Sequence, residues 1–284
     1  MKRLRGLRVS GLTIGMLLAA STLMAQDEGA TWQRRTPRPN QVPLFHSETS
    51  LHLPTAQTLG EGEIGFEILH RFLPPISSGS NGLWGFDGPA NIRFALTYAP
   101  TDRLMLSLGR SNRLDNYDLQ AKTRVYEAGG HDYSFSAALV GGLAWNTEVS
   151  GRDDGDALNW QYYGELVLNG LFSERFGIGV VPAYLNNPVV EDLDRDDALS
   201  VGLYAHYYAN KVLGLIAEYN VSDFRAELPY DSFALGFHLE TGGHFFKILV
   251  TNTTSLNPSQ YLAGSVNEIT TDELRFGFNV TRVF

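Results

Sequence analysis

The sequence predicts an all-β protein, a transmembrane antiparallel up-and-down β-barrel of about 12 strands that follows an N-terminal signal peptide. Three features lead to this prediction: a final strand that ends on an aromatic residue, a series of segments in which apolar and polar residues alternate, and connections that alternate in length. The final segment carries Leu274, Phe276, Phe278 and Val280 on one parity, with small or polar residues between them. Transmembrane barrels impose this two-residue period because one parity faces lipid and the other faces the lumen.

The chain ends at Phe284, and this terminal aromatic residue is similar to the C-terminal signal that the outer-membrane assembly machinery reads. We therefore expect the barrel assembly machinery, outer-membrane lipid and lipopolysaccharide as partners. Arg282 departs from the pattern because it lies on the lipid-facing parity. A charge near the membrane interface costs only roughly 0–1 kcal/mol, so the prediction stands.

Residues 1–25 have the features of a secretory signal peptide. Lys2, Arg3, Arg5 and Arg8 precede a mostly apolar stretch that ends near Ala25. The sequence contains no Cys, which excludes a lipoprotein anchor and a disulfide framework. Removal of residues 1–25 takes Lys+Arg from 22 to 18 against 31 Asp+Glu, a formal charge of −13. Nucleic-acid binding is not expected, because it requires a basic surface.

Residues 26–62 form a separate N-terminal segment with an irregular, proline-interrupted sequence that does not suit a strand. Two positions are open for it: it hangs in the periplasm as a linker, or it folds into the lumen as a plug. Leu51, Leu53 and Leu59 favour some packing. A plug would weaken any channel hypothesis.

The barrel itself is predicted over residues 63–284. After the signal peptide no run of about 18 apolar residues occurs, so insertion into a membrane would have to be by strands. The alternating segments, bounded by turn residues, are Glu63–Phe72, Asn91–Ala99, Arg103–Gly109, Tyr117–Val125, Tyr133–Trp145, Trp160–Asn169, Phe176–Tyr184, Leu199–Tyr208, Val212–Asn220, Ser232–Glu240, Phe245–Thr253 and Glu273–Phe284.

The connections between these segments alternate between short turns and longer loops. Links after even-numbered segments are short, whereas links after odd-numbered segments are mostly long and polar. Outer-membrane barrels have short periplasmic turns and longer extracellular loops. The pattern therefore predicts a bacterial outer-membrane location, with a secreted soluble β-domain as the alternative.

Several short motifs in the first half of the barrel resemble a known family. They are His70–Phe72, Asn91–Phe94, Thr101–Leu104, Gly109–Ser111 and Tyr117–Lys122. Together they are similar to an uncharacterised family of membrane-bound bacterial β-barrels classified as a domain of unknown function, clearly over residues 59–125 and by strand pattern elsewhere. The resemblance implies an outer-membrane barrel and implies no known activity, substrate or catalytic residue.

Charged and histidine side chains on the inward parity suggest what the lumen does. A basic set on the second to fourth segments faces a more acidic set on later segments. The candidates for lining the lumen are Arg93, Arg103, Lys122, Arg124, Glu165, Glu218, Glu240, His206 and His238. Charged rings of this kind select solutes, so the sequence predicts a narrow, porin-like passive channel for small polar or anionic solutes.

Two alternatives remain open. The charges could pair across the lumen and seal it, leaving a structural, adhesive or partner-binding role for the extracellular loops. Twelve strands lie between the filled interior of about eight strands and the open channels of 16–18 strands. The third hypothesis, an outer-membrane hydrolase, needs a nucleophile beside a histidine. No spacing brings a serine to His206 or His238, so we predict no catalytic residue, no cofactor and no enzyme activity.

No metal site is predicted either. The run Asp192–Asp197 begins like an EF-hand loop, but Asp197 stands at the position that requires glycine. Asp153, Asp154 and Asp156 form a similar acidic tip. We interpret these tips as solvated extracellular loops, with divalent bridging to lipopolysaccharide phosphates as the alternative.

Overall fold

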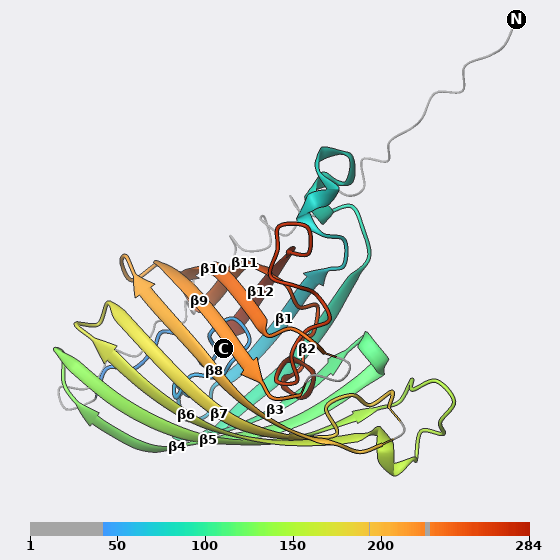
Figure 1. Ribbon diagram of the computed structural model, residues 1–284. Helices are drawn as coiled ribbons and strands as arrows, with labels where there is room; N and C mark the ends of the chain where they lie inside the picture. The colour runs from blue at the N-terminus through green and yellow to red at the C-terminus, as the bar shows by residue number, and fades with distance from the viewer. Residues whose placement is uncertain (1–41, 193, 225–227) are drawn as a thin grey trace, which may run out of the picture.

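The computed structural model describes residues 42–192, 194–224 and 228–284. Residues 1–25, which the sequence assigns to a signal peptide, lie outside the described residues. Twelve strands form a closed barrel (Figure 1). They are β1 Ile64–Phe72, β2 Ala90–Thr101, β3 Leu104–Ser111, β4 Asn116–Gly129, β5 Tyr133–Asn146, β6 Trp160–Phe172, β7 Phe176–Asn186, β8 Asp197–Tyr208, β9 Leu213–Ser222, β10 Ser232–Thr241, β11 His244–Thr251 and β12 Arg275–Val283.

The topology is up-and-down throughout. Each strand pairs antiparallel with its neighbours in sequence, and β1 closes the ring by pairing with β12 from Gly65 opposite Val283 to Arg71 opposite Gly277. Among the described residues, short helical turns lie in the connections: η1 Ile76–Ser78, η2 Ser80–Gly85, η3 Arg113–Asp115, η4 Ala157–Asn159 and α2 Pro258–Tyr261. Among the described residues, no helix has the length and apolar character needed to cross a membrane.

Each of the twelve predicted segments coincides with one strand, so the predicted barrel fold is confirmed. Several strands run beyond their alternating residues, because hydrogen bonds to the neighbouring strand continue past them. For example, the predicted segment Tyr117–Val125 becomes β4, Asn116–Gly129. The last strand is shorter than predicted and runs over Arg275–Val283.

Burial alternates along the strands as the two-residue period requires. On β8, for example, Leu199, Val201 and Leu203 are exposed on the outside, whereas Ser200 and Tyr204 are buried on the inside. The outer surface is therefore an apolar belt, and the inner surface is largely polar.

The interior of the barrel is filled by two segments that do not belong to the wall. Residues 43–59 lie inside, as the blue segment in Figure 1 shows, and residues 252–265 of the β11–β12 loop fold in with α2. Phe45, Leu53, Tyr261 and Leu262 from these segments belong to one buried apolar cluster with side chains of the wall. Residues 43–59 of the N-terminal segment thus lie in the lumen rather than in the periplasm, whereas residues 26–41 lie outside the described residues.

Candidate functional site

Residues 43–59 occupy the lumen, and we call them the lumenal plug. Its tip is a tight turn in which Thr49 pairs with Pro54 and the Ser50 N–H donates to the Leu53 carbonyl at 2.7 Å. The plug forms no strand of the sheet, so most of its backbone groups need partners elsewhere. The inner wall of the barrel provides them.

Glu218 on β9 binds the tip of the plug from one side. Its carboxylate accepts hydrogen bonds from three consecutive backbone amides, those of Leu51, His52 and Leu53, at 3.0–3.2 Å. Glu218 is only 2% exposed. Burial of a charge is costly unless the charge is paired and hydrogen-bonded, and these amides meet that requirement.

Two lysines bind the plug from other sides of the barrel. The Nζ of Lys122 on β4 donates to the carbonyls of Glu48 at 2.7 Å and Thr55 at 3.1 Å. The Nζ of Lys247 on β11 donates to the Thr49 carbonyl at 2.8 Å. The wall therefore contacts the amides of the tip with an anion and the flanking carbonyls with cations.

Neutral side chains from further strands complete these contacts. Three of them donate to plug carbonyls: Ser134 on β5 to Pro43 at 2.6 Å, Tyr204 on β8 to Pro54 at 3.0 Å, and Asn279 on β12 to Leu51 at 2.7 Å. The fourth, Asn169 on β6, accepts from the Ala56 N–H at 2.8 Å. Partners thus lie on strands all around the ring, so the plug spans the cross-section of the lumen.

His52 connects the plug to three other parts of the molecule. Its Nδ1 lies 3.0 Å from Glu218 Oε1, and its Nε2 lies 3.2 Å from Nε and 3.0 Å from Nη2 of Arg71 on β1. Because Arg71 can only donate, Nε2 must accept and Nδ1 must carry the proton, which makes the ring neutral. Burial, and then the Arg71 guanidinium, lowers the pKa of His52 from 6.5 to about 4.

The β11–β12 loop closes the lumen on the other side of the plug. The Tyr261 ring stacks on the His52 ring with centroids 4.3 Å apart. The loop is held to the wall by Asn220, whose Nδ2 donates to the Leu262 carbonyl at 3.1 Å, and by Gln161, whose Nε2 donates to the Ser259 carbonyl at 3.3 Å. The sequence predicted an extracellular loop here; its apolar residues turn inwards instead.

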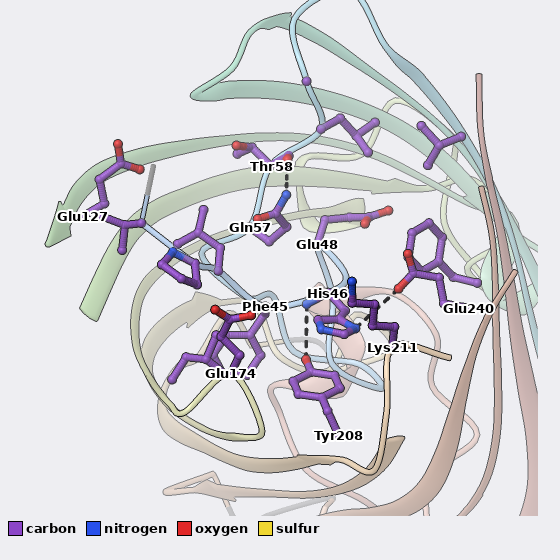
Figure 2. Close-up of a pocket in the computed structure, with 18 of the residues that line it drawn as sticks. Phe45, His46, Glu48, Gln57, Thr58, Glu127, Glu174, Tyr208, Lys211 and Glu240 are labelled. Carbon is purple, nitrogen blue, oxygen red and sulfur yellow. Dashed lines mark hydrogen bonds and ion pairs between the residues drawn. The ribbon is translucent and has the colours of Figure 1, made fainter. Parts of the chain in front are cut away.

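A cavity of about 770 Å³ lies below the plug, at the end of the barrel that carries the short turns. Figure 2 shows His46 of the plug between Tyr208 and Glu240 in this cavity. Its ring stacks on Tyr208 with centroids 3.9 Å apart, and its Nδ1 lies 3.4 Å from the Glu240 carboxylate. Glu127 and Lys211 also line the cavity. This mouth of mixed charge leads up to the plug.

The arginines of the basic wall expected from the sequence are paired with carboxylates. Arg93 is buried and donates to both carboxylate oxygens of Asp118, at 2.9 and 2.6 Å. Arg103 and Arg124 both pair with Glu127, at 3.0 and 2.9 Å. The Arg103 side chain is 58% exposed and lies in the turn between β2 and β3, at the rim of the barrel.

A β-bulge explains why the sequence pattern did not reveal the partner of Arg124. Residues three apart lie on opposite faces of a regular strand, but the pairing of β4 with β5 shifts register between Arg124 and Tyr126. The shift brings Glu127 to the same face as Arg124. The acidic partner is therefore supplied by the same strand.

The predicted acidic residues have three different environments. Glu218 holds the plug, and Glu240 lies at the mouth beside His46. Glu165 on β6 is 4% exposed, and neither of its carboxylate oxygens accepts a hydrogen bond within the described part of the chain. These carboxylates do not form one continuous acidic wall.

The two predicted histidines face the plug. His206 Nε2 lies 3.0 Å from Ser50 Oγ, and its Nδ1 lies 3.0 Å from Tyr208 Oη. His238 lies among aromatic rings, with Tyr208 and His46 centroids 6.3 and 6.1 Å away. In residues 42–192, 194–224 and 228–284, no group of three or more His, Asp or Glu side chains could hold a metal ion.

Sequence analysis did not identify the partner of Arg93, and it did not identify the contacts of His52 with Glu218 and with Tyr261. Asp118 lies on the inward parity of the same segment as Lys122, so counting inward carboxylates would have found it. No sequence signal pairs His52 with Glu218, which is 166 residues away, or with Tyr261 in a loop.

A family model described as a membrane bound beta barrel domain (DUF5777) matches residues 45–284. Comparison with curated proteins found no match. Among solved structures, the chain is similar to the NanC porin, with 8% identity, a TM-score of 0.47, and 78% of this chain and 98% of that chain covered. It is also similar to Omp33 of Acinetobacter baumannii (10% identity, TM-score 0.42, coverage 79% and 99%) and to an outer membrane channel of Pseudomonas putida F1 (17%, 0.44, 81% and 98%). The family match and the closed barrel confirm the predicted bacterial outer-membrane location.

Proposed function

The chain belongs to the membrane bound beta barrel domain family, and we propose that it is a passive outer-membrane channel for small polar solutes that its own lumenal plug closes. One observation carries this proposal. The charged inner wall is matched to the backbone of a segment that is not part of the barrel, through Glu218, Lys122 and Lys247.

The chemistry of the wall suits a lumen that can also hold water. A permanent core is usually built from apolar side chains, because burial of charges stabilises a fold little even when they are paired. Here the wall presents amides, hydroxyls and charges, all of which water can satisfy once the plug moves away. Departure of the plug therefore exchanges protein hydrogen bonds for water hydrogen bonds and leaves a polar passage.

The charges that the plug would uncover are nearly balanced. Lys122, Lys247 and Arg71 would lose plug partners, and so would Glu218 and Glu240. Arg93 would keep Asp118. We therefore propose passage of small polar solutes with weak charge selectivity, in place of the anion preference that the basic residues alone suggested.

The direct test is conductance in a planar bilayer of the refolded chain with and without residues 43–58. The barrel without the plug should conduct steadily, whereas the full chain should be closed most of the time. The heat-modifiable gel shift of folded barrels shows that each sample is folded. If the deletion variant does not fold, Lys122→Met/Lys247→Met removes two sets of plug contacts without shortening the chain, and it should open more often than the full chain.

Two results would overturn the proposal. A folded barrel that stays silent without its plug would mean that the β11–β12 loop alone seals it. A full chain that conducts as steadily as the deletion variant would mean that the plug does not gate.

The sealed barrel is the second candidate, and the inward fold of the β11–β12 loop favours it. Tyr261 and Leu262 are each 1% exposed and close the lumen independently of the short-turn end. In that case the protein would act through its remaining loops.

A hydrolase is less well supported. Ser50 and His206 form a hydrogen-bonded pair, but they are 0% and 1% exposed, and a phenol rather than a carboxylate orients the imidazole. We propose that this pair anchors the plug and is not catalytic.

A further inference from the structure

The β1–β2 connection carries an exposed apolar tip that the channel proposal does not use. The tip consists of Leu83, Trp84 and Phe86, whose exposed fractions are 54, 50 and 49%. The connection contains η1 and η2 and projects from the end of β1, as the teal coils in Figure 1 show. Large apolar side chains grouped at such a position usually mark an interaction surface.

The rest of the β1–β2 connection packs tightly around the tip, and we call it the frame. Leu83 and Trp84 have φ angles of 46° and 52°, which L-residues rarely adopt, and Gly85 continues the left-handed run with φ 95°. A Cβ on Gly85 would lie 2.5 Å from the carbonyl oxygen of Pro74, so the turn packs directly against the chain that leads into it. Strained conformations of this kind persist only where the surroundings enforce them.

Further hydrogen bonds fix the frame to the barrel. The Trp84 N–H donates to the Gly79 carbonyl at 2.7 Å, and the Ile76 N–H donates to the Leu274 carbonyl, just before β12, at 2.7 Å. The Leu73 N–H donates to the Pro89 carbonyl at 2.9 Å and closes the base of the connection. The tip is therefore held in one position relative to β1 and β12.

The tip is continuous with the apolar outer surface of the barrel. The Phe86 ring stacks on Phe276 of β12 with centroids 4.7 Å apart, and it meets the edge of Phe72 of β1 at 4.9 Å. Phe72 and Phe276 lie on the outward parity of their strands, the parity that faces lipid. Phe86 thus extends the lipid-facing surface beyond the ends of the strands.

We propose that Leu83, Trp84 and Phe86 form an anchor that inserts into the lipid of the outer leaflet beside β1 and β12. The connection follows an odd-numbered strand, on the side that carries the longer, extracellular loops of outer-membrane barrels. Trp favours the boundary between acyl chains and headgroups, because its ring is apolar and its indole N–H remains hydrogen-bonded. The anchor would fix the depth of the barrel next to the β1–β12 closure. This inference does not depend on whether the lumen conducts.

The test uses Trp84 as its own reporter. The sequence contains four Trp, so Trp32→Phe, Trp145→Phe and Trp160→Phe leave Trp84 as the only one. The refolded protein is placed in phosphatidylcholine vesicles with bromine atoms at a shallow or a deep position on the acyl chains. We expect strong quenching of Trp84 by shallow bromine, weaker quenching by deep bromine, and little quenching by aqueous acrylamide.

A matched control comes from a polar loop that follows another odd-numbered strand. Asp153→Trp in the same background with Trp84→Phe places the reporter at an exposed position of the β5–β6 loop, where acrylamide but not bromine should quench it. Trp84 quenched by acrylamide alone would overturn the anchor. Trp84 shielded from both quenchers would also overturn it, because a second copy or another protein would then cover the tip.

Discussion

His52 of the lumenal plug stacks on Tyr261 of the β11–β12 loop, with ring centroids 4.3 Å apart and ring planes 7° apart. This contact joins the two segments that fill the lumen, one inserted from the short-turn end and one folded in from the long-loop end. Since both rings are buried, displacement of the plug removes one face of the packing around Tyr261. The lumenal plug and the β11–β12 loop should therefore leave the lumen together.

Acid should weaken the plug through His52. In the plugged barrel the pKa of His52 is about 4, below its usual value of 6.5. The stability with which His52 holds the plug in the lumen is therefore fully present above pH 6.5 and is lost as the pH falls towards 4. At pH 5 these values give a docking constant lower by roughly 30-fold. The groups that face the ring are Glu218, Arg71, Lys247 and Tyr261. We expect the open probability in planar bilayers to rise between neutral pH and pH 5.

The matched variant for this prediction is His52→Gln, which keeps a donor and an acceptor but cannot be protonated. Its open probability should depend less on pH in this range. His131→Gln, in the exposed turn between β4 and β5, should leave the profile unchanged. An identical pH profile in the His52→Gln variant and the unmodified chain would assign the acid response to other groups.

Glu218 and Glu165 should respond in opposite ways to neutralisation. Glu218→Ala leaves three plug amides and the Nδ1 of His52 without their buried acceptor, and loss of one partner of a buried pair costs about 3–5 kcal/mol. Glu165→Gln replaces a buried carboxyl group that accepts no hydrogen bond in the described residues, so it should be neutral or stabilising. The temperature at which the folded barrel loses its heat-modifiable gel mobility measures the effect of each substitution on stability. Equal destabilisation by the two substitutions would contradict the role given to Glu218.

Gly179 on β7 should be intolerant of a side chain because Tyr204, a wall residue that binds the plug, lies against it. A Cβ there would overlap the ring of Tyr204, whose hydroxyl donates to the Pro54 carbonyl of the plug at 3.0 Å. Gly179→Ala should cost about 1–3 kcal/mol and loosen the plug. Gly141→Ala on β5 is the control, because nothing lies within 4 Å of its added Cβ. Protease cleavage within residues 43–59 should rise in the first variant only; equal cleavage in both would argue against this packing.

The wall of the barrel was predictable because each strand carries its own signal. The two-residue alternation of segments such as Leu199–Tyr208 decides which side chains face lipid, whatever the rest of the chain does. The same parity put Lys122, Glu218 and His206 on the inside, where the structure has them.

The contents of the lumen were not predictable, because they depend on contacts between distant and irregular segments. Glu218 binds Leu51 across 167 residues, and neither the plug tip nor the β11–β12 loop has a period that identifies a partner. The charge balance was also misjudged, since Asp118 on β4 neutralises Arg93 from two strands away and Glu127 neutralises Arg124 on its own strand. A bulge in β4 hid the second of these pairs.

A reversible crosslink tests most directly whether the plug must leave the lumen for solutes to pass. A Cβ on Gly202 of β8 would lie 3.2 Å from Leu53 Cγ, the position that a sulfur at residue 53 would take, and the matching distance in a disulfide is about 3 Å. The chain has no Cys, so Leu53→Cys/Gly202→Cys introduces a single possible intramolecular bridge. Conductance is recorded under mild acid, before and after reduction, with each single variant as control. We predict a silent oxidised protein that conducts once it is reduced and closes again on reoxidation; equal conductance in both oxidation states, or silence in both, would contradict a gate formed by the plug.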